Sequence, residues 1–159
     1  MSGHIVSSHP PHLQRLDRVW IRSPVYFLTT CTRQRQKLLA TPATAEVLVT
    51  EWSSASERHG WHIGRYVIMP DHVHFFAAPG PGAKPLESFM AKWKEWTAKR
   101  ILFSSGNTAP LWQTRFFDHL LRSNESLSAK WAYVRDNPVR AGLVAMAEEW
   151  RYQGSIHFE

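Results

Sequence analysis

The strongest constraint on the fold lies in residues 61–78, where only Pro70 and Asp71 separate two apolar stretches. Residues 61–69 (WHIGRYVIM) and residues 72–78 (HVHFFAA) are rich in β-branched and aromatic side chains, which favours strands. Such a short link joins consecutive strands only in the antiparallel sense. The sequence therefore predicts a β-hairpin, and the rest of the chain must supply the layers that pack on it.

A strand and a helix are expected before this hairpin. Residues 25–31 (VYFLTTC) are dense in β-branched and aromatic residues and follow a proline, as a buried strand after a turn would. A helix should come next, because Thr41 can cap it, Pro42 suits its first turn and Gly60 can end it. The apolar residues at helical spacing on one face of that helix are Val47, Leu48 and Trp52.

Two further helices are expected after the hairpin. Residues 86–103 carry apolar residues at helical spacing, and residues 111–121 are expected to be extended in part. A last helix should begin near Ser126 and carry Tyr133. It should end at Asn137, because Pro138 disfavours helical geometry in the residue before it.

The order of these elements predicts an α+β domain with a ferredoxin-like antiparallel sheet packed by helices, most simply on one face. A chain of 159 residues fits a single domain with a real core. Residues 1–14 combine Ser, His and a Pro-Pro pair with little apolar content, which predicts a flexible arm. The domain itself is expected to span residues 15–159.

Composition narrows the compartment and the partners. One cysteine, Cys31, excludes a disulfide framework, and no apolar run approaches 18 residues, so we expect a cytoplasmic protein with no membrane segment. The 19 Lys and Arg outnumber the 13 Asp and Glu, giving a net charge of +6 that favours a polyanionic partner such as nucleic acid. A basic surface that only keeps the protein soluble stays open as the alternative.

His72 and His74 are two positions apart on a predicted strand, so both imidazoles should project from the same face and could reach one cation. The pattern alone is weak, because a chain with nine histidines often contains such a pair by chance. Hydrogen bonds to the neighbouring backbone or to Asp71 would satisfy the two rings equally well. The pair therefore needs support from the rest of the chain.

Tyr133 and Asn137 are four positions apart on the last expected helix, so their side chains should face the same way. A structural interpretation is available for each residue: Tyr133 as a half-buried aromatic, and Asn137 as the cap of a short turn at Pro138. Neither residue by itself points to chemistry.

Three segments taken together resemble one family. They are residues 66–79 (YVIMPDHVHFFAAP), 111–123 (LWQTRFFDHLLRS) and 133–144 (YVRDNPVRAGLV). In order and spacing they resemble the HUH single-tyrosine transposases, and among these the REP-associated tyrosine transposases of bacteria. The resemblance runs from about residue 18 to residue 150.

The resemblance implies a small antiparallel sheet that displays His72 and His74 as metal ligands, and a C-terminal helix that presents Tyr133 as the catalytic nucleophile. Asn137 matches the family's third metal ligand, for Mg²⁺ or Mn²⁺. The family's Arg-Phe-x-Asp-His-x-x-Arg segment is also present. Within this segment we expect Arg115 and Arg122 to contact the DNA strand, and Asp118 and His119 to have supporting roles.

The expected activity is that of a metal-dependent transposase that nicks and rejoins single-stranded or hairpin-containing DNA. In this scheme Tyr133 attacks a phosphodiester and keeps the 5′-phosphate, so one ester replaces another and no ATP is needed. The protein could act as a monomer or a homodimer. A protein of the same fold that binds DNA or RNA without cutting it is the alternative, whereas a metal hydrolase of the amidohydrolase type needs about 250 residues.

A basic group on one expected helix is a further candidate for binding the DNA strand. The helix over residues 86–103 carries four cations and an aromatic side chain that suit phosphates and unpaired bases. An ordinary helix with solvated lysines is the alternative. The residues of this group are Lys92, Lys94, Trp96, Lys99 and Arg100.

Overall fold

The computed structural model describes residues 24–159, so the predicted arm over residues 1–14 lies outside the described residues. The chain first forms strand β1 (Val25–Cys31), the short 3-10 helix η1 (Arg33–Arg35), and helices α2 (Pro42–Ser53) and α3 (Ala55–His59). Strands β2 (Trp61–Ile68) and β3 (His72–Pro79), helix α4 (Leu86–Ser105) and strand β4 (Phe117–Leu121) follow. Helices α5 (Asn124–Arg135) and α6 (Asn137–Arg140), the 3-10 helix η2 (Ala147–Glu149) and strand β5 (Gln153–Ser155) complete the order.

The predicted hairpin is confirmed. β2 pairs antiparallel with β3, with Ile68 opposite Val73 at the end next to the turn. The backbone N–H of Met69 donates to the carbonyl of His72 at 2.8 Å, which closes the turn around Pro70 and Asp71. The histidines therefore begin the strand that lies in the middle of the sheet.

The sheet has the strand order β4-β1-β3-β2-β5, and every pair is antiparallel. Its first four members carry the ferredoxin-like order, with α2 and α3 between β1 and β2 and α4 between β3 and β4. The predicted fold class is therefore confirmed. β5 extends the sheet beyond β2, and its three residues are too few for the alternation that would have predicted a strand.

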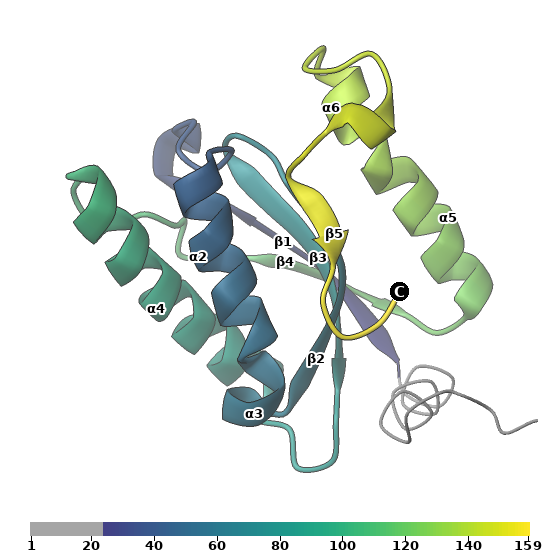
Figure 1. Cartoon of the computed structure of the whole chain (residues 1–159). Coiled ribbons are helices and arrows are strands. Elements are labelled where there is room, and N and C mark those ends of the chain that lie inside the picture. Colours follow the sequence, from purple (N-terminus) through teal and green to yellow (C-terminus); the bar gives the residue numbers. More distant parts are fainter. Residues whose placement is uncertain (1–23) are drawn as a thin grey trace, which may run out of the picture.

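Helices cover both faces of the sheet, which corrects the simplest expectation of one covered face (Figure 1). On one face α2, α3 and α4 bury a large aromatic core that includes Trp52, Phe75 and Trp93. On the other face α5 packs Leu127 and Val134 into a second, smaller core. The apolar side of α5 is thus buried against the face of the sheet that the other helices leave open.

Local signals explain the helix boundaries. Thr41 caps α2 by accepting from the backbone N–H of Thr44 at 3.2 Å, as predicted. The single helix expected up to Gly60 is interrupted at Ser54, which separates α2 from the short α3. Gly60 ends α3 with φ of 75°, a left-handed conformation that glycine adopts without strain.

The last helix is shorter at its end than predicted. Ser123 caps α5 and accepts from the backbone N–H of Ser126 at 3.1 Å, so the helix begins at Asn124. It ends at Arg135, and Pro138 lies in the first turn of α6. Proline fits a first helical turn because its missing N–H would have no partner there.

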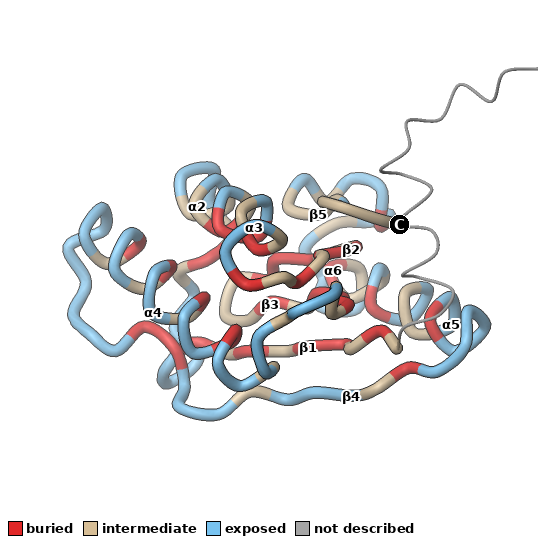
Figure 2. The backbone as a smooth tube through the Cα atoms, turned by 90° about the horizontal axis from the view of Figure 1, so that it is seen from below, coloured by how far each residue is buried: buried red, intermediate tan, exposed pale blue. Residues whose placement is uncertain are grey.

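Burial follows the layers (Figure 2). Buried residues are concentrated on the inner strands, whereas β4, at the edge of the sheet, is mostly exposed. None of the helices within residues 24–159 is long and apolar enough to cross a membrane.

Candidate active site

His72 and His74 both project toward the layer of α5. Alternation along β3 places them on the side of Phe76, which packs in the α5 core, while Val73 and Phe75 belong to the core on the opposite face. The two imidazole ring centres are 4.7 Å apart and the rings are nearly perpendicular. The sequence-based expectation that the rings share one face is confirmed.

A neighbouring oxygen holds Nδ1 of each ring. Nδ1 of His72 lies 2.7 Å from Oδ1 of Asp71, and because a carboxylate only accepts, this nitrogen carries the proton. Nδ1 of His74 lies 2.7 Å from Oγ1 of Thr29, a hydroxyl that can accept in the same way. Neither Nε2 atom has a hydrogen bond to a described residue, and where Nδ1 carries the proton, Nε2 has a lone pair that a cation can use.

Burial favours the neutral form of both rings. It lowers the pKa of His74 to about 3; Lys130 and Arg140 act in the same direction, as does His72 when its own ring is protonated. Burial also lowers the pKa of His72 below its usual value, although Asp71 opposes the shift. A neutral imidazole is the form that binds metal ions. The electrostatics of the pair therefore suit a ligand role.

Tyr133 is exposed on α5, with 64% of its surface accessible. It lines an open hollow of about 520 Å³ between α5 and the end of β4. Arg122, from the end of β4, and Lys130, one turn before Tyr133 on α5, line the same hollow. The phenol therefore faces a solvent-accessible, positively charged surface.

Phe27 connects this hollow to the histidines. Nζ of Lys130 lies 5.1 Å from the centre of the Phe27 ring. His74 is another neighbour of Phe27, and its ring stacks on the phenyl ring with centres 5.2 Å apart. The hollow that contains Tyr133 and the histidine pair thus lie in the same layer, between the sheet and α5.

Arg140 joins Tyr133 to Asn137. Its guanidinium donates to Oδ1 of Asn137 and, at 2.7 Å, to the backbone carbonyl of Tyr133. Its Cζ lies 4.0 Å from the centre of the phenol ring. Tyr133 and Asn137 therefore lie on one side of the helix pair, as the four-residue spacing predicted.

Asn137 is the residue expected to be the third metal ligand. Within residues 24–159 no cluster of three His, Cys, Asp or Glu side chains is able to hold a metal ion. The expected ligand is instead the amide oxygen of Asn137. In this structure that oxygen accepts from Arg140.

The β4 residues divide between the two faces. His119 pairs with Phe27 across the sheet and so lies on the α5 side, where it lines the hollow. Asp118 pairs with Leu28, whose side chain is in the opposite core, so the register directs Asp118 away from the histidines. Arg115 is exposed in the stretch before β4.

Helix α4, which carries the basic group, packs on the face of the sheet opposite to α5 (Figure 1), whereas the histidine pair projects toward α5. Lys92 and Lys99 each pair with Glu95 at 3.3 Å. Lys94 donates to two backbone carbonyls, and Arg100 pairs with Glu51 at 2.9 Å. The side chain of Trp96 is half-exposed, and Nζ of Lys99 lies over its ring. These residues do not join the candidate active site, and their contact with DNA stays a prediction.

The sequence interpretation missed two cations at the site, Lys130 and Arg140. A signal existed for each: Lys130 is three positions before Tyr133, and helical residues at that spacing are neighbours. Arg140 falls within the matched segment 133–144, three positions after Asn137. Neither was singled out, because a lysine or arginine on an exposed helix is usually solvated.

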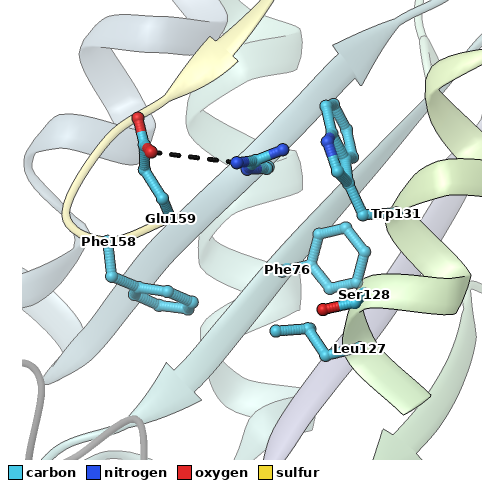
Figure 3. A pocket seen from close by; sticks show the side chains of 7 residues that line it. Phe76, Leu127, Ser128, Trp131, Phe158 and Glu159 are labelled. Atoms are coloured by element: carbon cyan, nitrogen blue, oxygen red, sulfur yellow. Dashed lines mark ion pairs between the residues drawn. The ribbon is translucent and has the colours of Figure 1, made fainter. Parts of the chain in front are cut away.

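A second pocket, of about 210 Å³, lies on the other side of α5 (Figure 3). Figure 3 shows Leu127, Ser128 and Trp131 of α5 facing the C-terminal residues Phe158 and Glu159 across it. None of the predicted catalytic or metal-binding residues lines this pocket.

Comparison with known proteins relates this chain to transposases. The model of the family described as "Transposase IS200 like" matches residues 22–137. A REP-associated tyrosine transposase of Escherichia coli (strain K12) is 24% identical over 135 residues, which are 85% of this chain and 78% of that protein.

The fold is also similar to a solved structure, that of a REP-associated tyrosine transposase bound to a REP hairpin. The TM-score is 0.67 at 23% sequence identity, and the match covers 82% of this chain and 75% of the other. This likeness concerns the arrangement of the sheet and its helices.

Proposed function

This chain belongs to the IS200-like transposase family, and from that premise we propose that it nicks and rejoins single-stranded DNA through a covalent phosphotyrosine at Tyr133. Its structural relative is bound to a REP hairpin, and we extend this class of substrate to the present chain as a DNA hairpin with unpaired flanks. The observation that carries the proposal is the shared layer of Tyr133 and the histidine pair, connected by Lys130 and Phe27.

Tyr133 suits a nucleophile that must meet a long substrate. Its phenol is exposed, whereas a tyrosine with only a packing role would be covered. In the proposed step the phenol oxygen forms a bond to phosphorus and the bond from phosphorus to the 3′-oxygen breaks. The proton lost by the phenol is balanced by the one that the new 3′-hydroxyl gains. Because a phosphodiester remains, a 3′-hydroxyl can reverse the step.

The residues of the hollow suit a strand of phosphates. Lys130 and Arg122 present two cations beside the phenol, and His119 adds a polar side chain from the adjacent strand. Cations that line an open surface bind a polyanionic backbone without reading its sequence. We assign these residues to holding the phosphates that flank the cleaved bond.

His72 and His74 fit a divalent cation, because both rings are neutral and both Nδ1 atoms are held, which directs the Nε2 lone pairs outward. Asn137 would supply an amide oxygen in exchange for its bond to Arg140. A bound Mg²⁺ or Mn²⁺ would offset the charge that builds on the phosphate, and imidazole ligands favour Mn²⁺.

A direct test is incubation of the protein with a labelled DNA hairpin that has single-stranded flanks, in Mn²⁺ or Mg²⁺. We expect a covalent protein–DNA adduct that denaturing gels retain and that Tyr133→Phe abolishes. Tyr152→Phe is the matched control and should retain the adduct, because Tyr152 lies elsewhere and packs against Trp150.

The same experiment distinguishes a strand transferase from a protein of this fold that only binds DNA. A protein that binds the hairpin tightly but forms no adduct, with Tyr133→Phe indistinguishable from the unaltered chain, would be a binding protein of this fold and not a transferase.

A further inference from the structure

A strained turn follows β1 directly. Gln34 and Arg35 have φ of 56° and 54°, and they are the only non-glycine residues with positive φ within residues 24–159. Residues other than glycine rarely adopt this backbone conformation, because their Cβ atom crowds the backbone. Two consecutive residues keep it only where surrounding contacts compensate, and such strain is concentrated at functional sites.

The strained turn directs the side chain of Arg35 back toward the start of β3. Nε of Arg35 donates to Oδ2 of Asp71 at 2.9 Å, and Nη1 donates to Sγ of Cys31 at 2.9 Å. The backbone fixes the turn at the same place, since the N–H of Thr32 donates to the carbonyl of Asp71 at 2.9 Å. Backbone and side chain of the turn thus converge on one residue, Asp71.

Asp71 divides its two carboxylate oxygens between two partners. Oδ2 accepts from Arg35, and Oδ1 accepts from Nδ1 of His72 at 2.7 Å. Nη2 of Arg35 lies 3.5 Å from the same Nδ1, so the three groups form one compact cluster. A carboxylate held on one side by a guanidinium presents its other oxygen in a fixed direction.

We propose that Arg35 is a positioning residue: it anchors Asp71, which fixes the ring of His72 in the Nδ1–H tautomer with Nε2 directed outward. The metal-ligand role of His72 rests on the proposed function, whereas the tautomer depends only on this cluster. Carboxylates that orient a ligating histidine in this way raise its metal affinity.

An exposed ion pair alone would not support this role, because such pairs contribute little to stability. Two observations set Arg35 apart. Its backbone is strained, and its guanidinium also contacts Cys31, whose Cα partner across the sheet is His72. The strained conformation therefore brings the guanidinium to the end of the sheet where the histidines lie.

The test is a nitrogen-15 NMR spectrum of the histidine ring nitrogens, recorded without metal or DNA. We expect the signal of His72, identified by its absence in His72→Gln, to show one protonated Nδ1 in the unaltered chain. Arg35→Ala should mix the two tautomers, and Arg35→Lys should restore part of the Nδ1–H form. Titration with Mn²⁺ alone should show binding about tenfold weaker in Arg35→Ala.

Arg33→Ala is the matched control, because Arg33 is an exposed arginine in the same 3-10 helix. It should leave both the spectrum and the Mn²⁺ affinity unchanged. Gln34→Gly should raise thermal stability and keep the tautomer, since glycine accepts the positive φ while the guanidinium stays in place.

The proposal is overturned if Arg35→Ala retains the Nδ1–H tautomer and binds Mn²⁺ within twofold of Arg33→Ala. Arg35→Met, which keeps the length of the side chain without its charge, gives the same two readings if the alanine variant does not fold. Neither reading needs DNA. A protein that forms no phosphotyrosine but shows the tautomer change would thus contradict the proposed function and leave the role of Arg35 standing.

Discussion

The guanidinium of Arg140 lies over the phenol ring of Tyr133, with Cζ 4.0 Å from the ring centre, and it also donates to Oδ1 of Asn137. One cation thus contacts both the proposed nucleophile and the proposed amide ligand. Guanidinium groups bind phosphate more strongly than they bind a neutral amide. A phosphate that reaches Tyr133 would therefore compete with Asn137 for Arg140.

Arg140→Ala should slow single-turnover cleavage of a hairpin substrate about 100-fold, the usual effect of removing a donor to the charge that develops in a transition state. Arg140→Lys should be intermediate, because it keeps the charge but not the planar fork. Arg135→Ala, at the exposed end of α5, is the control. Equal rates for the two alanine variants would exclude a role for Arg140 at the phosphate.

Lys130→Ala should weaken binding of single-stranded DNA. It should also make the fall of log affinity with log salt concentration less steep by about 0.7, the change for one lost phosphate contact. Lys99→Ala tests the other predicted DNA-binding group, on the far side of the sheet, and should have the smaller effect on both quantities because Lys99 already pairs with Glu95. Fluorescence anisotropy over a series of salt concentrations measures both quantities. The reverse result would favour the basic face of α4 as the strand-binding surface.

Stability without metal should fall as the solution is acidified. The unfolded chain binds a proton at His74 as pH drops through 6.5, whereas the folded chain resists protonation until a pKa of about 3. Stability from this group is therefore complete above pH 6.5 and is lost below it, by at most about 1.4 kcal/mol for each pH unit.

Urea unfolding in the presence of a chelator, measured between about pH 7.5 and about pH 5, checks this dependence. His74→Gln should show a flatter dependence on pH than the unaltered chain. Identical slopes would mean that His74 gains its proton over the same pH range in the folded and the unfolded chain, and that burial does not lower its pKa.

Thr97→Val should destabilise the fold by about 1–3 kcal/mol, although the two side chains have nearly the same shape. The hydroxyl of Thr97 is buried and accepts from Nε1 of Trp112 at 2.9 Å, so valine would leave that indole N–H without a partner. Ser104→Ala, on the exposed side of the same helix, is the control. Equal unfolding midpoints in urea for the two variants would contradict the assignment.

Much of the sheet was predictable from short-range signals. The two-residue link at Pro70 and Asp71 leaves no topology other than a hairpin. The order of strands and helices along the chain then indicates the ferredoxin-like arrangement. The position of α5 was not predictable in the same way. Leu127 and Val134 indicate that one side of the helix is buried, but periodicity carries no information on which face of the sheet receives it.

The site was predictable only where spacing along one element sufficed. His72 and His74 share a face because they are two apart on a strand. The contact of Arg35 with Asp71 spans 36 positions and depends on a positive φ, so no pattern in the sequence around Arg35 indicates it. Resemblance to a family supplied the roles, and the structure supplied these long-range partners.

The small core beneath α5 is separate from the large aromatic core on the other face of the sheet. Substitutions in one core are therefore expected to leave the packing of the other largely unchanged. A substitution at Leu127 or Val134 should loosen the helix that carries Tyr133, while the aromatic core around Trp52 and Trp93 continues to stabilise the sheet from its opposite face. The position and orientation of the Tyr133 phenol can thus change during evolution, or by design, without a change in the sheet that carries the histidines.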